Sequence, residues 1–266
     1  MASARRRPAA TWRLRKEGFG KLERQAFEGL ESWRPALSLQ GTAYKNKLRE
    51  KQFRDSIRRE LAQPAHFRLF NGEWDKVTVV ESARRQLEQS SIAELARAAG
   101  GDPLDTMLDL ALEEDLATVF SALLLNSDEA AVGRMLRHPA SLVSLSDAGA
   151  HLTFFNDAGY GLHLLGHWVR GLGALTLEEA ARRLTSHPAR VFGIRERGAL
   201  KPGYHADLLL FDPASVGRGP KQRVFDLPGG HARLTTPALG VESVGVNGVR
   251  LEGEARAGRL LRHFSA

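Results

Sequence analysis

Apolar residues recur at helical spacing in several parts of the chain. Within residues 45–61, Leu48, Phe53, Ile57 and Leu61 follow one another at intervals of four or five positions, separated mostly by charged residues. This pattern predicts an amphipathic helix with one buried face and one basic, solvated face. A basic run can also attract phosphates, but no recognised nucleic-acid module accompanies it, so we favour the solvated face and expect no nucleic-acid partner.

Start signals mark further helices. A capping box pairs a Ser or Thr with a Glu three residues later, and an Asp directly before Pro also opens a helix. One helix should end near His138, because Pro139 disfavours helical geometry in the residue before it. The start signals are Ser91 with Glu94, Asp102 before Pro103, Ser127 or Asp128, and Thr176 with Glu179.

Short apolar runs predict strands at 76–80, at 141–146 (SLVSLS) and at 206–211 (ADLLLF). Because SLVSLS directly follows a helix, it fits a buried parallel strand of an α/β protein, in a barrel or an open sheet. Residues 244–251 predict two strands joined by Asn247 and Gly248, a pair typical of a type I′ hairpin. We therefore expect an α/β part that ends near residue 198 and a small β unit after it.

Composition limits the available chemistry. The 266 residues are 42% hydrophobic, enough for one large domain or two small ones. Cysteine is absent, so a metal would be held by His, Asp or Glu. No apolar run reaches the roughly 18 residues that span a bilayer, and the first residues lack a signal-peptide pattern. We expect a cytoplasmic protein with no membrane partner.

The net charge of +7 is concentrated near the N-terminus. Residues 1–60 hold 16 Lys and Arg against 7 Asp and Glu, whereas the remainder holds 22 against 24. Residues 1–30 show no clear period and predict a basic, poorly ordered arm.

Asp147 is the first candidate for chemistry. It lies in the segment SDAGAH at residues 146–151, directly after the SLVSLS run, and α/β folds place catalytic groups at the carboxyl ends of parallel strands. A carboxylate there can bind a metal, or can take a proton from water and return it to a leaving nitrogen. The alternative is that Asp147 only caps a turn. His151 could orient Asp147 or contact substrate, or it could be a structural histidine.

Other polar residues offer weaker candidates. Arg170 could bind a substrate carboxylate through its bidentate fork, although a surface role is the alternative. His163 and His167 are four residues apart, a spacing that zinc sites use, but the accompanying HExxH pattern is absent and nearby glycines weaken the helix. We favour a structural role for this histidine pair.

Seven motifs follow one another at compatible spacing: LFNGEW (69–74), SDAGAH (146–151), WVR (168–170), LTLEEAARRLTSHPARVFGI (175–194), RGALKPGYHADLLLFDP (197–213), RVFDLPGGHARL (223–234) and GVESVGVNG (240–248). Together they resemble the end of the N-acyl-D-amino-acid deacylases, or D-aminoacylases, of the amidohydrolase superfamily. GALKPGYHADL alone occurs more widely in that superfamily. The resemblance extends from about residue 30 to the C-terminus.

The resemblance implies the C-terminal part of a TIM-like (β/α)8 barrel over 31–198 and part of a β-sandwich over 199–266. It also implies a zinc-dependent hydrolase of non-peptide C–N amide bonds, with a small N-acyl amino acid as substrate. Asp147 matches the aspartate after the last barrel strand, a catalytic residue and metal ligand that accepts the proton of the attacking water. Cyclic-amide hydrolysis or deamination is the alternative chemistry, because it uses the same barrel and a similarly placed aspartate.

A TIM barrel alone takes about 250 residues, and only about 170 precede the β unit here. The family's other metal ligands lie upstream of the matched region, so we expect this chain not to retain zinc by itself. The chain is then part of a deacylase, completed by a missing N-terminal half or by a homo-oligomer, or it is a non-catalytic remnant.

Overall fold

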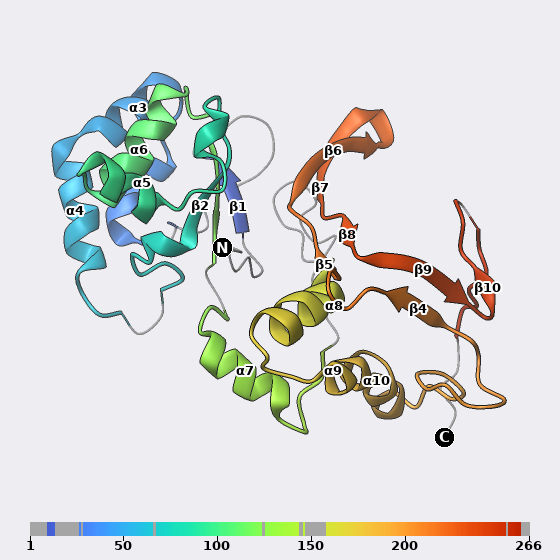
Figure 1. Ribbon diagram of the computed structural model, residues 1–266. Coiled ribbons are helices and arrows are strands. Elements are labelled where there is room, and N and C mark those ends of the chain that lie inside the picture. Colours follow the sequence, from blue (N-terminus) through green and yellow to red (C-terminus); the bar gives the residue numbers. More distant parts are fainter. Residues whose placement is uncertain are drawn as a thin grey trace. The chain divides into compact units, whose positions relative to one another are not determined.

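The computed structural model describes residues 10–13 (backbone only), 27, 29–65, 68–123, 126–143, 146, 158–253 and 255–261. The chain divides into two compact units (Figure 1). The N-terminal unit is Pro8–Ser127, and the C-terminal unit is Asp128–Ala266 with Met1–Arg7.

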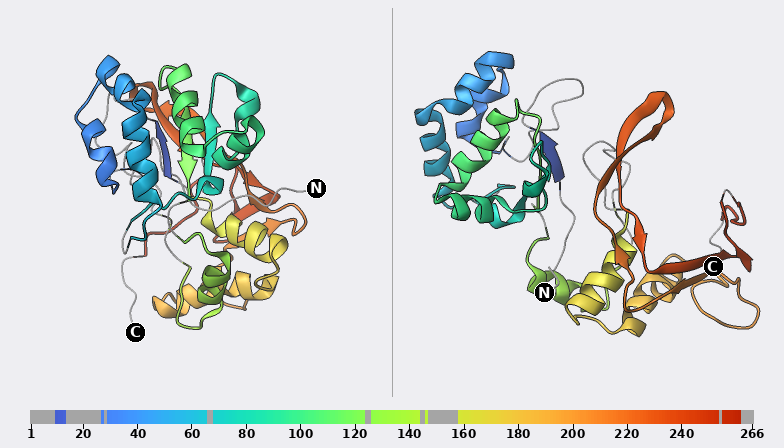
Figure 2. Two further views of the ribbon diagram at one scale, coloured as in Figure 1. Left: turned by 90° about the vertical axis from the view of Figure 1, so that its left-hand side faces the viewer. Right: turned by 45° about the horizontal axis from the view of Figure 1, so that its top comes forward.

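Helices make up most of the N-terminal unit. An aromatic cluster fills its core: Phe27 stacks on Trp33 with ring centroids 4.5 Å apart, and Phe53 and Phe70 lie 5.4 Å from Trp33 and 5.5 Å from Phe27. In Figures 1 and 2 the four longer helices gather in one group. The helices are η2 (Glu31–Trp33), α2 (Arg34–Leu37), α3 (Gly41–Arg49), α4 (Lys51–Leu61), η3 (Trp74–Lys76), η4 (Arg85–Leu87), α5 (Ile92–Ala99) and α6 (Pro103–Glu113).

Capping explains where α5 and α6 begin. The Ser91 hydroxyl accepts from the Glu94 backbone N–H at 3.1 Å, and the Glu94 carboxylate accepts from the Ser91 N–H at 2.8 Å. These reciprocal bonds satisfy donors that the first helical turn leaves free. The Asp102 carboxylate accepts from the Asp105 N–H at 3.0 Å. Both predicted helix starts are confirmed.

The predicted helix over 45–61 is two helices, because the chain is extended at Glu50 (φ −63°, ψ 122°) between α3 and α4. Phe53 and Ile57 are buried as predicted. The prediction that the basic side is solvated is partly wrong. Arg54 contacts two aspartates of α6, Asp105 at 2.9 Å and Asp109 at 2.6 Å, and its side chain is only 11% exposed. The acidic partner face lies about fifty residues along the chain, so periodicity within 45–61 could not show it.

A three-stranded antiparallel sheet completes the N-terminal unit. Its order is β1 (Ala10–Arg13), β3 (Val119–Ala122), β2 (Val77–Glu81), so that β3 is central and all four of its residues are buried. The strand predicted at 76–80 is confirmed. Four residues of the segment expected to be an arm form β1.

The C-terminal unit opens with a group of helices. The N-cap Asp128 accepts from the Ala131 N–H at 2.9 Å, and α7 ends at Arg137 with His138 as its C-cap, close to the predicted end. Thr176 accepts from the Glu179 N–H at 3.2 Å and starts α9. The helices are α7 (Glu129–Arg137), α8 (Tyr160–His163), the π-helix η5 (Leu164–Gly171), α9 (Leu177–Leu184) and α10 (Ser186–Val191).

A buried arginine links α9 to the end of α7. The Arg183 side chain is 1% exposed. Its guanidinium donates to the carbonyl oxygens of Arg137 at 2.9 Å and of His138 and Ser141 at 3.2 Å, and to the Glu179 carboxylate at 2.7 Å. Three of these bonds satisfy main-chain acceptors where α7 ends, a place where a helix leaves carbonyls free. Arg183 therefore fixes the course of the chain from Arg137 to Ser141.

The remaining strands form small antiparallel ladders, and Figure 2 shows β6 and β7 as a long two-stranded hairpin. Asn247 (φ 50°) and Gly248 (φ 79°) both have positive φ, which confirms the predicted type I′ turn between β9 and β10. The sheets are β10-β9-β4, β5-β8 and β6-β7. The elements are β4 (Leu208–Phe211), β5 (Gly217–Arg218), β6 (Gln222–Leu227), η6 (Pro228–Gly230), β7 (His231–Thr235), β8 (Ala238–Leu239), β9 (Val241–Val246) and β10 (Val249–Arg250).

The parallel strand predicted at 141–146 is not seen in its described part. Residues 141–143 and 146 lie outside any strand, and every strand pair among the described residues is antiparallel. A parallel strand needs a neighbouring strand as partner for its backbone groups, and an apolar run does not show whether that neighbour is present. Within the described residues, no helix is long and apolar enough to cross a membrane.

We expect Arg183→Met to lower the free energy of unfolding of the C-terminal unit by about 3 kcal/mol, because it leaves the carbonyl oxygens of Arg137, His138 and Ser141 without their charged donor. Urea denaturation measures the loss. Arg182→Met is the control, since Arg182 also pairs with Glu179 but is 37% exposed, and its effect should be much smaller. Equal losses in the two variants would contradict the role given to Arg183.

The Glu179 carboxylate also predicts a pH dependence. A hydrogen bond from Arg182, opposed by burial and reinforced by Arg183, lowers the pKa of Glu179 from 4.5 to about 2. Because the pKa is lower in the folded chain than in the unfolded one, its stabilising effect is complete above pH 4.5 and is lost as the pH falls towards 2. We expect Glu179→Gln to flatten the stability profile between pH 5 and 2, as followed by denaturation, and Glu178→Gln to flatten it less.

Candidate functional site

The two residues on which the predicted chemistry depends, Asp147 and His151, lie outside the described residues. The described chain nearest to them is Ser146 on one side and Ala158 on the other. The site is therefore described by the elements that lead into and out of this segment.

The segment that leads to Asp147 starts from a fixed point. Arg183 holds the Ser141 carbonyl at 3.2 Å, and Ser141 precedes Asp147 by six residues. Val143 packs with the apolar cluster that contains Leu164 and Trp168. The chain entering the SDAGAH segment is thus held by one buried cation and one apolar contact.

The segment that follows Asp147 leads into α8 and the π-helix η5. His163 and His167 lie on one face, with rings stacked at a centroid distance of 4.7 Å and an interplanar angle of 10°. His167 is 7% exposed, and its Nε2 lies 3.0 Å from Oε1 of Glu129 on α7. The carboxylate orients the imidazole, because one ring nitrogen is committed to it. Glu129 carried no sequence signal beyond its place in the first turn of α7, and it was missed.

Close backbone contact accompanies the π-helix. A Cβ at Gly166 would lie 2.7 Å from the Val216 carbonyl oxygen and 2.9 Å from Cα of Gly217, so only glycine fits between η5 and β5. π-helical turns are rare and occur frequently at functional sites. Gly166, one of the glycines that weaken an α-helix here, allows this approach.

Arg170, the predicted substrate contact, lies at the end of η5. Its Nη1 donates to the Val216 carbonyl and, at 3.3 Å, to the Pro213 carbonyl. These bonds fix the turn that precedes β5. Contact of Arg170 with a substrate carboxylate stays a prediction.

The described residues do not fit the metal centre that the family implies. Across the described part of the chain no group of three or more His, Asp or Glu side chains is arranged to hold a metal. His167 and Glu129 lie close together, but they are only two possible ligands and they already bond each other. Three or four protein ligands are typical of a zinc site, so further ligands would have to come from elsewhere.

Comparison with known proteins identifies the family. A sequence model described as the amidohydrolase family matches residues 59–250. N-acyl-D-glutamate deacylase of Alcaligenes xylosoxydans xylosoxydans is 35% identical over 143 residues, which cover 51% of this chain and 27% of that protein. D-aminoacylase of the same organism is 39% identical over 108 residues, covering 39% of this chain and 20% of the relative.

A crystal structure of N-acyl-D-glutamate deacylase from Bordetella bronchiseptica, complexed with zinc and a phosphonate inhibitor, is 30% identical. The match covers 70% of this chain and 36% of that one, with a TM-score of 0.38. The chain thus spans little more than a third, at most, of the relatives it matches. The family model covers more than half of the chain, and the protein therefore belongs to the amidohydrolase family.

Proposed function

We propose that this chain is the C-terminal part of a metal-dependent amidohydrolase whose complete form hydrolyses the C–N amide bond of N-acyl-D-amino acids. The observation that carries the proposal is the family match over 59–250, which includes the SDAGAH segment. The names of two relatives, N-acyl-D-glutamate deacylase and D-aminoacylase, support the substrate class. A cytoplasmic location remains a prediction.

Residues 31–198 would then contribute to a TIM-like barrel and 199–266 to a β-sandwich, with 1–30 as an arm. Zinc would belong to the complete enzyme, since the Bordetella relative was solved with zinc. Because the described residues do not fit a metal centre, we assign no step to the metal in this chain.

Asp147 is the residue to which we assign proton transfer. A carboxylate at this place would take the proton of the attacking water and deliver it to the departing nitrogen. His151 would orient Asp147 or contact the substrate, and Arg170 would contact a substrate carboxylate with donors other than the Nη1 that bonds the carbonyls of Pro213 and Val216.

A missing half would need a surface on which to dock, and β4 supports this part of the proposal. Among the described residues it is the edge strand of sheet β10-β9-β4, and three consecutive leucines, Leu208, Leu209 and Leu210, are 45–57% exposed. An unpaired edge with apolar side chains is a template for another strand. The occupant would be the N-terminal half of the enzyme or a second copy of this chain.

The second candidate is a non-catalytic remnant. This chain covers only 27% and 20% of the length of two relatives. Such short coverage is as compatible with a remnant as with one part of a completed enzyme. Cyclic-amide hydrolysis or deamination is the alternative chemistry. Zinc distinguishes a completed enzyme from a non-catalytic remnant, because a ligand that binds only the folded state raises its stability. Zinc should raise the melting temperature of a completed enzyme and leave the melting temperature of a remnant unchanged.

Combining this chain with an N-terminal amidohydrolase half tests the catalytic assignment. We expect zinc-dependent release of the amino acid from N-acetyl-D-glutamate or another N-acyl-D-amino acid, and a loss of several orders of magnitude in kcat in Asp147→Asn, because the amide side chain cannot accept the proton. Asp75→Asn, at an exposed position of η3, is the control and should keep full activity. Near-normal turnover in Asp147→Asn would reject the assignment.

The edge strand generates a separate prediction for the isolated chain. Leu210→Lys should reduce self-association, as measured by light scattering over a concentration series, because a charge on an edge strand opposes pairing with another strand. Leu200→Lys is the control: Leu200 is 84% exposed but lies outside any strand. If both variants dissociate the chain equally, general solubility and not the β4 edge explains the effect.

A further inference from the structure

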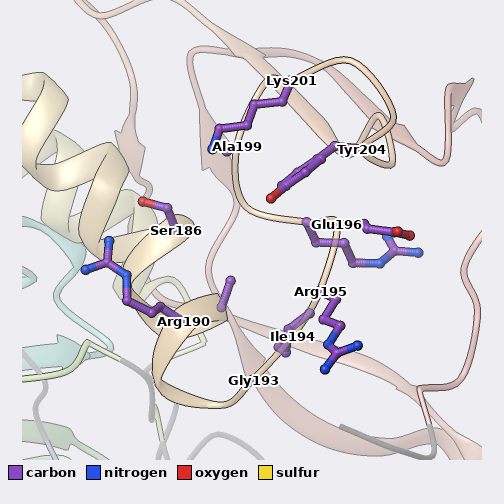
Figure 3. Close-up of a pocket in the computed structure, with 11 residues that line it drawn as sticks. Ser186, Arg190, Gly193, Ile194, Arg195, Glu196, Ala199, Lys201 and Tyr204 are labelled. Atoms are coloured by element: carbon purple, nitrogen blue, oxygen red, sulfur yellow. The ribbon is translucent and has the colours of Figure 1, made fainter. Parts of the chain in front are cut away.

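A pocket of about 560 Å³ lies between α10 and the loop that follows it. All of its lining residues belong to the segment 186–204 of the C-terminal unit. Figure 3 shows Ser186 and Arg190 on the helix and Lys201 and Tyr204 on the loop. The predicted chemistry does not use this pocket.

Backbone bonds hold the two walls in place. The Ile194 N–H donates to the Ala189 carbonyl at 2.7 Å, and the His205 N–H donates to the Glu196 carbonyl at 2.9 Å. Gly198 (φ 77°) packs so closely that a Cβ would lie 2.9 Å from the carbonyl carbon and oxygen of Thr185. Pocket walls that are fixed before binding lower the entropic cost of holding a ligand.

The lining is cationic. It contains Arg190, Arg195, Arg197 and Lys201 against a single carboxylate, Glu196. Such an excess of one charge in a concave site raises the local concentration of oppositely charged ligands.

One of these cations is already neutralised. Arg197 donates to Asp207 and, at 2.8 Å, to the Asn247 side-chain oxygen. Burial raises the pKa of Asp207, but hydrogen bonds from the Asn247 N–H and from Arg197 outweigh it, so that the pKa lies below its ordinary value. Asp207 is therefore ionised, and Arg197 serves the pocket wall.

The other cations have no carboxylate partner among the described residues. Arg190 and Arg195 make no ion pair there, and Lys201 lies 5.6 Å from the Tyr204 ring centroid. In Figure 3 the Lys201 amine and the Tyr204 hydroxyl both extend towards the side on which Ser186 and Arg190 lie. Arg and Lys side chains that have no carboxylate partner are the groups that bind phosphate oxygens in proteins, and hydroxyls can add further hydrogen bonds.

We propose that this pocket binds a small phosphate-bearing anion through Lys201, Tyr204, Ser186 and Arg190. A guanidinium offers two parallel donors to a phosphate, and an ammonium adds a point charge. The volume exceeds what a lone phosphate needs, so a diphosphate or an organic phosphate fits it better. This site is separate from the proposed deacylase chemistry, and its test needs no catalytic activity.

Calorimetric titration of the full chain with pyrophosphate, at constant ionic strength, tests the proposal. Saturable binding at one site is expected, and Lys201→Gln combined with Arg190→Gln should weaken it at least tenfold. Arg97→Gln with Arg134→Gln is the matched control, since it removes two cations that lie outside the pocket, and it should leave the affinity unchanged. Circular dichroism checks that both double variants fold.

Titration with ADP distinguishes the source of the phosphate. Tighter binding of ADP than of pyrophosphate assigns the site to an organic phosphate, and equal or weaker binding assigns it to an inorganic diphosphate. Three outcomes would overturn the proposal: no saturable binding of either ligand, equal binding of sulfate, or the same loss in the control variant. Each of these results would mean that the pocket is not a specific site for phosphate groups.

Discussion

The Arg183 guanidinium is the group on which the arrangement of the C-terminal unit most depends. It is buried, and a buried charge is costly unless it is paired and fully hydrogen-bonded. Glu179 supplies the countercharge from the preceding turn of α9, and the carbonyls of Arg137, His138 and Ser141 take the remaining donors. Moving α9 away from the end of α7 would break the three bonds to these carbonyls together. The chain that leads to Asp147 is therefore fixed at its start.

After the segment that contains Asp147, close packing fixes the position of η5 against β5. Gly166 lets η5 approach β5, and Arg170 bonds the carbonyls of the turn before that strand. Glu129 orients His167 from α7. α7, which precedes Asp147, is thus bonded to two elements that follow Asp147. Arg183 joins it to α9, and His167 joins it to η5.

Charge is used differently in the two units. In the N-terminal unit, Arg54 and Arg58 of α4 pair with aspartates of α6, so a run that is basic in sequence is largely neutralised between helices. In the C-terminal unit, Arg190, Arg195 and Lys201 around α10 lack such partners among the described residues. Basic composition alone does not separate these cases, because the compensating carboxylates lie far away along the chain.

Local interactions were predictable from the sequence, since they lie within a few residues of one another. The caps at Ser91, Asp102, Asp128 and Thr176, the end of α7 before Pro139 and the turn at Asn247-Gly248 depend on neighbouring backbone groups, and each was found where expected. The family also followed from the sequence, because its motifs are ordered along the chain. Asp147 and His151 were predicted in the same way; they lie outside the described residues and stay predictions.

Only the tertiary structure decided which side chains meet across long separations. The Arg54 pairs with α6, the bonds of Arg183 to the end of α7 and the contact of Glu129 with His167 join residues 38 to 55 positions apart. The SLVSLS run was expected to be a strand from its own composition, yet a strand also requires a neighbour that donates and accepts its backbone hydrogen bonds. Periodicity reports which face of a segment is apolar, whereas the partner of that face is set by packing.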